Sequence, residues 1–299
     1  MQPPHDLPEK IGPYRVLGRL GEGGMGQVYL AASPSRRLVA VKMIRPELLD
    51  DPHWRARFRR EVASARSVSG FYTAAVVDAD PDAELPWLAT QYIHGISLAE
   101  AVREKGPIPE QAACHLGAGL AEALIAIHRA EIVHRDLKPS NVLLAGDGPR
   151  VIDFGIARPL DARPLSRSTI VGTPAFMSPE QALGEAVTPA SDVFSLGSTL
   201  VYAATGTAPF GTDRKTRGRI VHRAPDLTGL PDPLRGLVTL CLAKAPEERP
   251  TPEQVLTALS TLLDAHYGEE WLPSAVGELI GAQERTLAQL TAELTPPHE

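Results

Sequence analysis

This sequence has few cysteines, no long apolar run and no excess of basic charge. Cys114 and Cys241 are its two cysteines, and each lies in an apolar segment with helical spacing. This argues against a disulfide-stabilised fold and favours buried thiols in a reducing cytoplasm. No stretch of about 18 apolar residues occurs, so we expect no membrane-spanning helix here. The first residues also lack the basic-then-apolar pattern of a secretory signal.

The charge balance is slightly acidic. Lysine and arginine number 30 and aspartate and glutamate 36, which gives a formal net charge of −6. Proteins that bind nucleic acids are usually basic, so we expect no nucleic-acid partner. The hydrophobic content of 43% and the charged content of 22% are ordinary for a globular protein. The length of 299 residues allows one large domain or two smaller ones.

Hydrophobic spacing changes character near residue 95. Before it, short apolar runs alternate with turn residues and predict strands over 14–20, 27–33, 38–44, 74–80 and 86–93, with one helix over 53–68. After it, apolar residues recur at helical spacing, interrupted by a predicted strand pair within 141–154. A last amphipathic helix is expected over 273–294. The pattern therefore predicts a small sheet-rich part followed by a larger helical part.

A glycine-rich segment, GEGGMGQVY, follows the first predicted strand. Gly21, Gly23 and Gly26 form a G-x-G-x-x-G pattern, in which the backbone can approach phosphates closely. Such a pattern is weak by itself, because glycine-rich turns are common. A dinucleotide-binding site would place a helix directly after the last glycine. Here the strand-like run QVYLAAS follows, which favours a glycine loop between two strands of a hairpin.

A lysine ends the next strand-like run, VAVK. A solvated lysine is the ordinary interpretation of Lys42, but its position after the glycine loop would let it reach phosphates bound beneath that loop. It would need an acidic partner to hold it in place. Glu61, in the predicted helix 53–68, is the best candidate, and the alternative is that Glu61 is a solvated helix charge.

Two further motifs follow in the helical part. VHRDLKPSNVLL places Asp136, Lys138 and Asn141 between apolar segments, and a D-F-G triplet begins at Asp153 after the strand-like residues Val151 and Ile152. A carboxylate at the end of a strand can hold Mg²⁺. Each motif proves little alone. Their order, after the glycine loop, lysine and glutamate, is very unlikely to arise by chance.

Together these motifs resemble the catalytic domain of Hanks-type (eukaryotic-like) bacterial protein serine/threonine kinases of the actinobacterial type, from about Tyr14 to His266. The resemblance implies an α+β bilobal protein-kinase fold, with a small β-rich N-lobe carrying one main helix and a larger, mostly helical C-lobe. The expected divisions are an N-terminal arm (1–9), the N-lobe (10–94), the C-lobe (95–266) and a C-terminal helical extension or linker (267–299).

The resemblance also implies a role for each motif. Asp136 would act on the substrate hydroxyl, Lys138 on the γ-phosphate, and Lys42 with Glu61 on the α- and β-phosphates, while Asn141 and Asp153 would hold Mg²⁺ or Mn²⁺. Thr90 would be the gatekeeper at the back of the adenine pocket. The residues expected around ATP are Leu20, Gly21, Gly23, Gly26, Val28, Ala40, Lys42, Thr90, Gln91, Ile93 and Leu143.

Regulation is expected in the segment after Asp153. The candidate phosphorylation sites are Ser166, Ser168 and Thr169, and Arg135 would pair with the loop phosphate. Thr173, in a G-T-P triplet, is expected to shape the substrate pocket first, and a merely polar loop is the alternative for all four hydroxyls. Ser178 replaces the alanine of the usual A-P-E triplet.

The resemblance implies protein substrates with serine or threonine acceptors, and it allows a homodimer. The basic segment 214–223 favours a solvated or disordered loop, with a docking patch for acidic partners as the alternative. The natural protein is expected to continue beyond Glu299, and the longer chain can be membrane-associated. Rival interpretations are a nucleotide-binding pseudokinase, which the complete motif set disfavours, and a kinase-like fold acting on small molecules.

Overall fold

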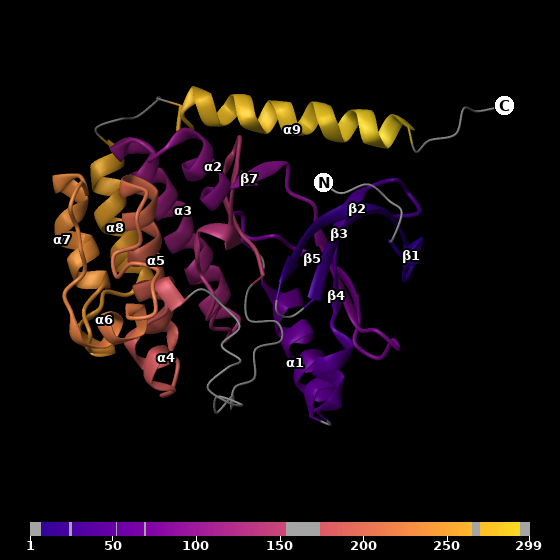
Figure 1. Ribbon diagram of the computed structural model, residues 1–299, viewed down its shortest axis with the longest axis horizontal. Coiled ribbons are helices and arrows are strands. Elements are labelled where there is room, and N and C mark those ends of the chain that lie inside the picture. The colour runs from indigo at the N-terminus through magenta and orange to yellow at the C-terminus, as the bar shows by residue number, and fades with distance from the viewer. Residues whose placement is uncertain are drawn as a thin grey trace.

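The chain folds into two lobes that lie side by side, with one long helix across both (Figure 1). This computed structural model describes residues 7–23, 26–51, 53–68, 70–153, 174–264 and 270–293. The first lobe is built on strands and the second on helices, which confirms the expected bilobal α+β fold.

The strands of the first lobe form an antiparallel sheet in the order β1-β2-β3-β4-β6-β5. Helix α1 (Trp54–Ser67) packs beside it. All five strands expected from the sequence are present within a few residues of their predicted ends. The strands are β1 (Lys10–Ile11), β2 (Tyr14–Gly23), β3 (Gly26–Ala32), β4 (Leu38–Ile44), β5 (Val76–Asp80) and β6 (Trp87–Gln91).

The alternating direction of side chains along β4 determines which of them face the second lobe. Val39 and Val41 are buried in a small cluster with Tyr29 on one face of the sheet. Because successive side chains of a strand point to opposite faces, Ala40 and Lys42 face the other way, toward the second lobe. Packing of the valines therefore orients the lysine.

The second lobe is organised around helix α3 (Glu110–Arg129), whose residues Leu116, Leu120 and Leu124 are fully buried. Helices α5 (Pro189–Thr205) and α8 (Pro252–Leu263) pack against it. The other helices are α2 (Leu98–Lys105), α4 (Pro179–Leu183), α6 (Thr216–His222), α7 (Asp232–Cys241) and α9 (Ser274–Glu293).

A small sheet and backbone hydrogen bonds join the two lobes. A three-stranded sheet of β7 (Gly95–Ser97), β8 (Val142–Ala145) and β9 (Gly148–Val151) lies at the boundary. The Val151 N–H donates to the Tyr72 carbonyl at 2.8 Å, and the Ala74 N–H donates to the Val151 carbonyl at 3.2 Å. Four short 3₁₀ turns complete the described elements: η1 (Pro46–Asp50), η2 (Pro139–Asn141), η3 (Pro174–Phe176) and η4 (Pro246–Glu248).

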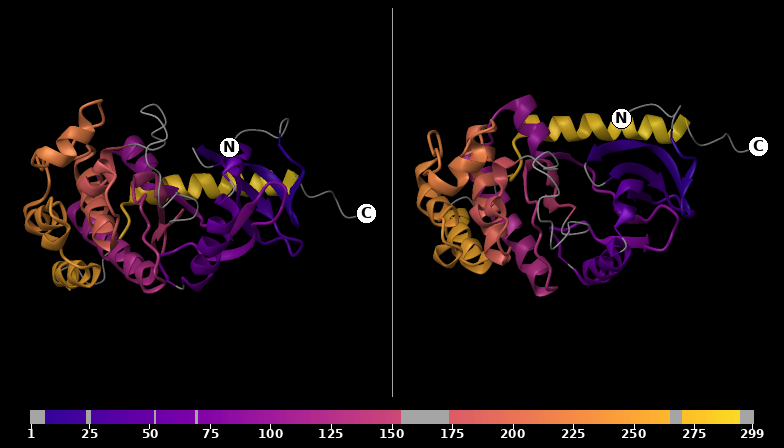
Figure 2. Two further views of the ribbon diagram at one scale, coloured as in Figure 1. Left: turned by 90° about the horizontal axis from the view of Figure 1, so that it is seen from below. Right: turned by 60° about the horizontal axis from the view of Figure 1, so that its bottom comes forward.

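Helix α9 runs from the helical lobe along both lobes (Figures 1 and 2). Its bounds agree with the helix expected over 273–294. Val276 and Ile280 are buried in the same core as α3, and the Trp271 indole donates to the Gly146 carbonyl at 3.0 Å. The helix is therefore anchored to the helical lobe at its N-terminal end.

The expectation of a loop over 214–223 was wrong, because α6 occupies most of this segment. Thr216 and Ile220 are fully buried, which gives the helix an inward face despite its basic composition. Arg217 donates to the Ala182 carbonyl and Arg219 to the Phe210 carbonyl, so two of the arginines hold the local structure. Strand β7 was not predicted, since three residues are too few to show alternation.

No described helix is long and apolar enough to cross a membrane.

Candidate active site

A cavity of about 650 Å³ lies between the two lobes. Fifteen of the predicted site residues line it, and they come from both lobes. They are Leu20, Gly21, Gly23, Gly26, Val28, Ala40, Lys42, Thr90, Gln91, Ile93, Asp136, Lys138, Asn141, Leu143 and Asp153. The fold thus gathers motifs that are more than 100 residues apart in the chain around one space.

The glycine-rich segment joins β2 to β3, which pair as an antiparallel hairpin with Gly23 opposite Gly26. This is the arrangement expected from the sequence. A Cβ atom at Gly21 or Gly23 would meet no atom within 4 Å, whereas a Cβ at Gly26 would lie 2.0 Å from the Met43 carbonyl oxygen. Gly26 is therefore required by close approach of β4, and the other two glycines leave the roof of the cavity open.

One end of the cavity is apolar. Leu20 and Val28 line it from the first lobe and Leu143 from β8. Ala40 pairs with Thr90 across β4 and β6, and the Thr90 hydroxyl lies 3.5 Å from the Ala40 carbonyl. Beyond Thr90 the chain passes to the second lobe through Gln91 and Ile93. An apolar pocket beside the backbone of a chain connection is suited to an aromatic base that also needs hydrogen bonds.

The opposite end carries the charged groups. The Lys42 ammonium lies 3.1 Å from Asp153 Oδ2, and the lysine side chain is only 13% exposed. The expected ion pair between Lys42 and Glu61 does not occur among the ion pairs that join described residues. Asp153 lines the cavity together with Lys42, and Glu61 is not among the lining residues.

Asp136 is held by two neighbours on the same loop. The Lys138 ammonium donates to Asp136 Oδ2 at 2.9 Å, and the Asn141 amide nitrogen donates to the Asp136 carbonyl at 2.8 Å and to its Oδ2 at 3.2 Å. Pro139 starts the turn η2, which brings Asn141 back toward Asp136. The loop thus holds the Asp136 carboxylate at the cavity through its Oδ2 oxygen.

The residues present fit a divalent cation. Because the Asn141 amide nitrogen is used in hydrogen bonds, its carbonyl oxygen is the end available to a cation. Asp153 supplies a carboxylate on the same cavity. Oxygen ligands of this kind suit Mg²⁺, which takes few protein ligands and keeps waters and phosphate oxygens. No cluster of three or more histidine, cysteine or carboxylate side chains occurs among the described residues.

A buried carboxylate fixes the backbone before Asp136. Asp192 on α5 accepts hydrogen bonds from the backbone N–H groups of His134 and Arg135, both at 2.8 Å, and lies 2.8 Å from His128 Nε2. Arg135 has a positive φ of 65°, a strained conformation for a residue with a side chain. The bonds to Asp192 hold this conformation, which points Asp136 into the cavity.

His134 links the same loop to Asp153. Its Nδ1 accepts from the Asp136 N–H at 3.2 Å, so the ring proton lies on Nε2, which faces the Ile152 carbonyl at 3.2 Å. Burial lowers the pKa of His134, because the charged ring would lose its hydration. The neutral imidazole therefore ties the Asp136 loop to the strand end that carries Asp153.

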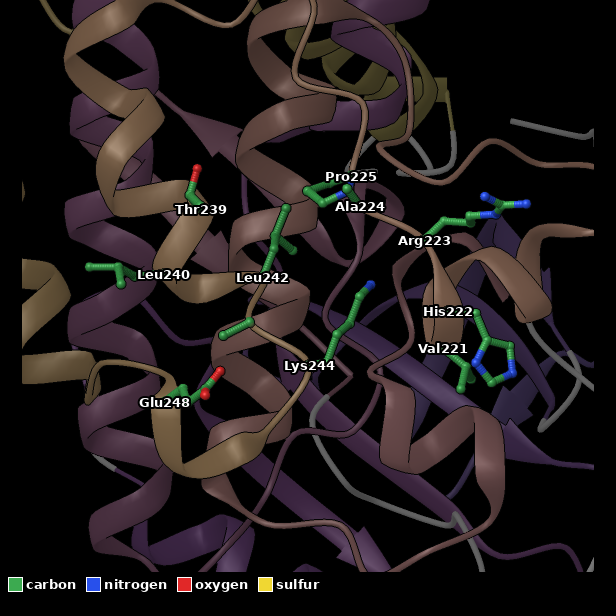
Figure 3. A pocket seen from close by; sticks show the side chains of 11 residues that line it. Val221, His222, Arg223, Ala224, Pro225, Thr239, Leu240, Leu242, Lys244 and Glu248 are labelled. Carbon is green, nitrogen blue, oxygen red and sulfur yellow. The ribbon is translucent and has the colours of Figure 1, made fainter.

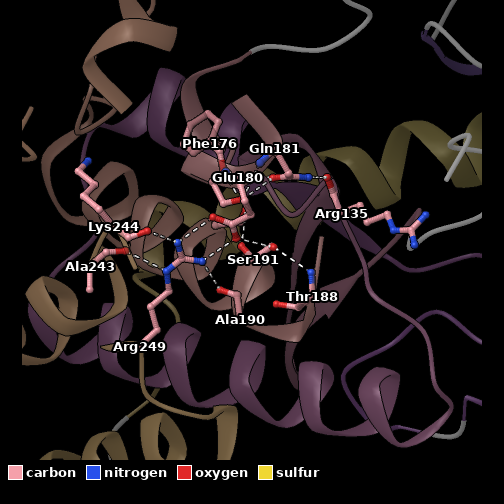
Figure 4. Close-up of polar contacts among 12 residues, drawn as sticks. Arg135, Phe176, Glu180, Gln181, Thr188, Ala190, Ser191, Ala243, Lys244 and Arg249 are labelled. Carbon is pink, nitrogen blue, oxygen red and sulfur yellow. Dashed lines mark hydrogen bonds and ion pairs between the residues drawn. The ribbon is translucent and has the colours of Figure 1, made fainter. Parts of the chain in front are cut away.

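An ion pair inside the helical lobe holds the segment that follows residue 173 (Figure 4). The Arg249 guanidinium donates to both oxygens of Glu180 at 2.7 and 2.8 Å, and both side chains are almost fully buried. Burial alone would raise the pKa of Glu180, but hydrogen bonds from Arg249 and Ser191 outweigh it and lower the pKa to about 2. The pair positions α4.

Ser178, which stands where an alanine is usual, has a structural role at the start of α4. Its hydroxyl caps α4 by accepting from the Gln181 N–H, and the Gln181 side chain accepts in return from the Ser178 N–H at 3.0 Å. The Gln181 amide nitrogen also donates to the Arg135 carbonyl at 2.8 Å. The cap thus connects α4 to the loop that carries Asp136.

Some predicted residues lie elsewhere. Glu61 is half-buried on α1, and Arg135 lies beside the cavity rather than on its lining. The candidate phosphorylation sites Ser166, Ser168 and Thr169, together with Thr173, lie outside the described residues.

Other lining residues escaped the sequence interpretation. Ser97 and Glu100 at the start of α2 line the cavity, and a search for polar residues beginning a helix after the hinge could have found them. Gln283 on α9 also lines it. No motif marks Gln283, because it is far from the others in the chain.

A second, more open cavity of about 770 Å³ lies on the helical lobe between the ends of α6 and α7 (Figure 3). Lys244 lies on its wall, donates to the Ile220 carbonyl at 2.6 Å and sits 4.1 Å from the centre of the Phe210 ring. Burial, followed by the charge of Arg249, lowers the pKa of Lys244 to about 8. This amine is therefore neutral more often than an exposed lysine at the same pH.

Known proteins with this pattern are numerous. The protein kinase domain family matches residues 14–259. The chain is 53% identical to the probable serine/threonine-protein kinase PkwA of Thermomonospora curvata, over 92% of this chain and 37% of that protein. It is 54% identical to the serine/threonine-protein kinase AfsK of Streptomyces coelicolor, over 93% of this chain and 36% of that protein.

Two more distant likenesses agree. The chain is 35% identical to the serine/threonine-protein kinase PknB of Mycobacterium tuberculosis, over 93% of this chain and 46% of that protein. The crystal structure of the Mycobacterium tuberculosis PknI kinase domain superposes with a TM-score of 0.69 at 26% identity, covering 87% of this chain and 99% of the other.

The chain spans less than half the length of these curated relatives. Its match to the family covers both lobes and every motif around the cavity between them. The chain therefore belongs to the protein kinase family, and its named relatives are actinobacterial serine/threonine kinases.

Proposed function

We propose that this protein transfers the γ-phosphate of ATP to serine and threonine hydroxyls of other proteins. The observation that carries the proposal is the single cavity that holds Lys42, Asp136, Lys138, Asn141 and Asp153. Phosphoryl transfer depends on positioning and charge neutralisation, and this set supplies both.

The two ends of the cavity bind different parts of ATP. The apolar end, with Leu20, Val28 and Leu143, encloses the adenine, and the backbone from Gln91 to Ile93 supplies its hydrogen bonds. The glycine hairpin covers the phosphates, and Gly21 and Gly23 leave room for their oxygens. Lys42 then neutralises phosphate charge from the side of β4.

At the reacting end, Asp136 orients the acceptor hydroxyl and takes its proton as the phosphate is transferred. Lys138, already 2.9 Å from Asp136, stabilises charge on the γ-phosphate. Asn141 and Asp153 are the residues that would hold Mg²⁺, for which Mn²⁺ can substitute. When bound, such a cation would neutralise phosphate charge. Glu61 is proposed as the carboxylate that receives Lys42 when Asp153 turns to the cation.

Labelling with radioactive ATP and a generic protein acceptor tests this function. Asp136→Asn removes the proton acceptor and should lower transfer by about 10²- to 10⁴-fold. Asp50→Asn, an exposed aspartate outside the cavity, is the matched control and should keep wild-type activity. Equal labelling by wild type and Asp136→Asn would refute the proposal, and binding of ATP without transfer by wild type would favour a pseudokinase.

Autophosphorylation at Thr169, Ser168 or Ser166 is the regulation that we propose. A phosphate brings nearly two negative charges, and Arg135 stands directly beside Asp136 to receive it. Mass spectrometry after incubation with Mg-ATP should find phosphate on this segment in wild type and not in Asp136→Asn. An unmodified segment in active wild-type protein would remove this part of the proposal and leave the transfer activity intact.

A role in bacterial signalling follows as a proposal from the named relatives.

Cys114 and Cys241 are buried free thiols, and burial raises their pKa to about 11 and about 12. Inert, reduced thiols of this kind support the expected cytoplasmic location of this part of the chain.

A further inference from the structure

Helix α9 takes part in enclosing the cavity between the lobes. Gln283, near the middle of this helix, is one of the lining residues, although the helix comes after the whole motif set in the chain. Figures 1 and 2 show α9 passing along both lobes from its anchor on the helical one. The cavity therefore has a wall that the kinase motifs do not provide.

The contacts of α9 show which end of the cavity it meets. The helix packs against β7 and α2, the elements that follow the connection between the lobes. Lys42 and Asp153, which mark the phosphate end, lie on β4 and after β9 instead. Because β7 begins two residues after Ile93, Gln283 lies at the end that takes the nucleoside.

A second contact supports this placement. Tyr92, which lines the cavity at the connection between the lobes, has a raised pKa, first from burial and then from the negative charge of Glu284. Glu284 is the residue next to Gln283. The middle of α9 therefore lies close to the connecting segment itself.

The position of α9 is held by apolar burial. Val276 and Ile280 are 2% and 7% exposed within the main core, and Leu287 is 4% exposed further along the helix. Residues buried on both sides of Gln283 fix the rotation of the helix and with it the direction of the glutamine. Gln283 itself is exposed, so its amide can meet a ligand in the cavity.

We propose that α9 forms part of the nucleotide site and that the Gln283 side-chain amide hydrogen-bonds the nucleoside portion of the bound nucleotide. The amide offers both a donor and acceptor to the sugar hydroxyls or the outer edge of the base. This inference rests on the proposed ATP-dependent function. By linkage, a bound nucleotide in turn holds α9 against the connection between the lobes.

Calorimetric titration of the whole chain with ATP, ADP and adenosine tests the contact. A neutral hydrogen bond is worth about 0.5–1.5 kcal/mol, so Gln283→Ala should raise the Kd of all three ligands by about 2- to 10-fold. A contact to the nucleoside predicts the same factor for each ligand. Gln289→Ala, an exposed glutamine further along α9 that does not line the cavity, is the matched control and should bind like wild type.

A second variant separates the contact from the fold. Ile280→Ser weakens the anchor of α9, and it should lower nucleotide affinity by a similar factor. The double variant Ile280→Ser/Gln283→Ala should then show no further loss, because the glutamine has already left the site. Thermal unfolding checks that each variant remains folded.

The outcomes distinguish the two proposals. Failure of the wild-type protein to bind ATP would overturn the proposed function, and this inference with it. Normal binding by wild type with an unchanged Kd in Gln283→Ala would overturn this inference alone. A loss for ATP and ADP but not for adenosine would place Gln283 at the phosphates and would equally refute the contact proposed here.

Discussion

The buried ion pair between Glu180 and Arg249 offers the sharpest stability prediction. Two hydrogen bonds of 2.7 and 2.8 Å join the side chains, and Arg249 also donates to the carbonyls of Ala243, Lys244 and Ala190 (Figure 4). Glu180→Gln would keep the shape and remove the charge. Arg249 would then be left as a buried cation without its carboxylate.

The magnitude follows from the lowered pKa. A fall from 4.5 to about 2 corresponds to about 3 kcal/mol of preference for the charged carboxylate, at about 1.36 kcal/mol per pH unit. Removing one partner of a buried pair costs about 3–5 kcal/mol in general. We therefore expect Glu180→Gln to lower the free energy of unfolding by about 3 kcal/mol, a large part of the total of a typical domain.

The pH dependence has a definite sign. The folded-state pKa of Glu180 lies below its unfolded value, so its contribution is present above about pH 4.5 and is lost as the pH falls toward about 2. The stability of wild type should therefore drop more steeply than that of Glu180→Gln over this range. At neutral pH the difference between the two should be largest.

Urea unfolding followed by circular dichroism measures these differences. Asp232→Asn is the control, because the ion pair of Asp232 with Arg235 lies at the surface, with the aspartate side chain 93% exposed. That change should alter stability by less than about 0.5 kcal/mol. Equal unfolding midpoints for Glu180→Gln and Asp232→Asn would refute the reasoning, as would a double variant Glu180→Gln/Arg249→Met less stable than both single variants combined.

Three other changes test separate parts of the structure. Gly26→Ala should lower the unfolding free energy by about 1–3 kcal/mol, because its Cβ would meet a carbonyl of the next strand at 2.0 Å, while Gly21→Ala meets nothing and should unfold like wild type in urea. Lys42→Met should reduce phosphoryl transfer by about 10²- to 10³-fold in the labelling assay while adenosine binding is kept, and equal losses of both would contradict its place at the phosphates. The rate of Lys244 acylation, followed by mass spectrometry, should reach half its maximum near pH 8, because burial lowers the pKa of this amine. A lysine in a short peptide has a pKa of about 10.4, and a midpoint near that value would show that burial does not lower the pKa of Lys244.

Local patterns predicted much of this protein. Alternating apolar residues marked β2, β3, β4, β5 and β6, and helical spacing marked α1 and α9, because these signals depend on residues close in the chain. The candidate site was also predictable. Each motif combines a backbone shape with a functional group over a few residues, as Pro139 does with Asn141.

Predictions were wrong or incomplete where contacts between residues far apart in the chain determine the structure. The basic segment became α6 because Thr216 and Ile220 find buried partners, which no local count of charges reveals. The ion pair of Lys42 with Asp153 at 3.1 Å was not among the expected contacts, because it joins residues that are far apart in the chain.

The sequence by itself determined the motif set, the two-part organisation and the family resemblance. Tertiary structure alone decided that Gly26 is required by packing, that Ser178 caps α4 and that Gln283 reaches the cavity. The physical reason is that a motif encodes chemistry within a few residues, whereas contacts between elements depend on how buried faces meet. Helix α9 reaches the site because Val276 and Ile280 are buried in the core. No motif near Gln283 in the chain predicts that this residue lines the cavity.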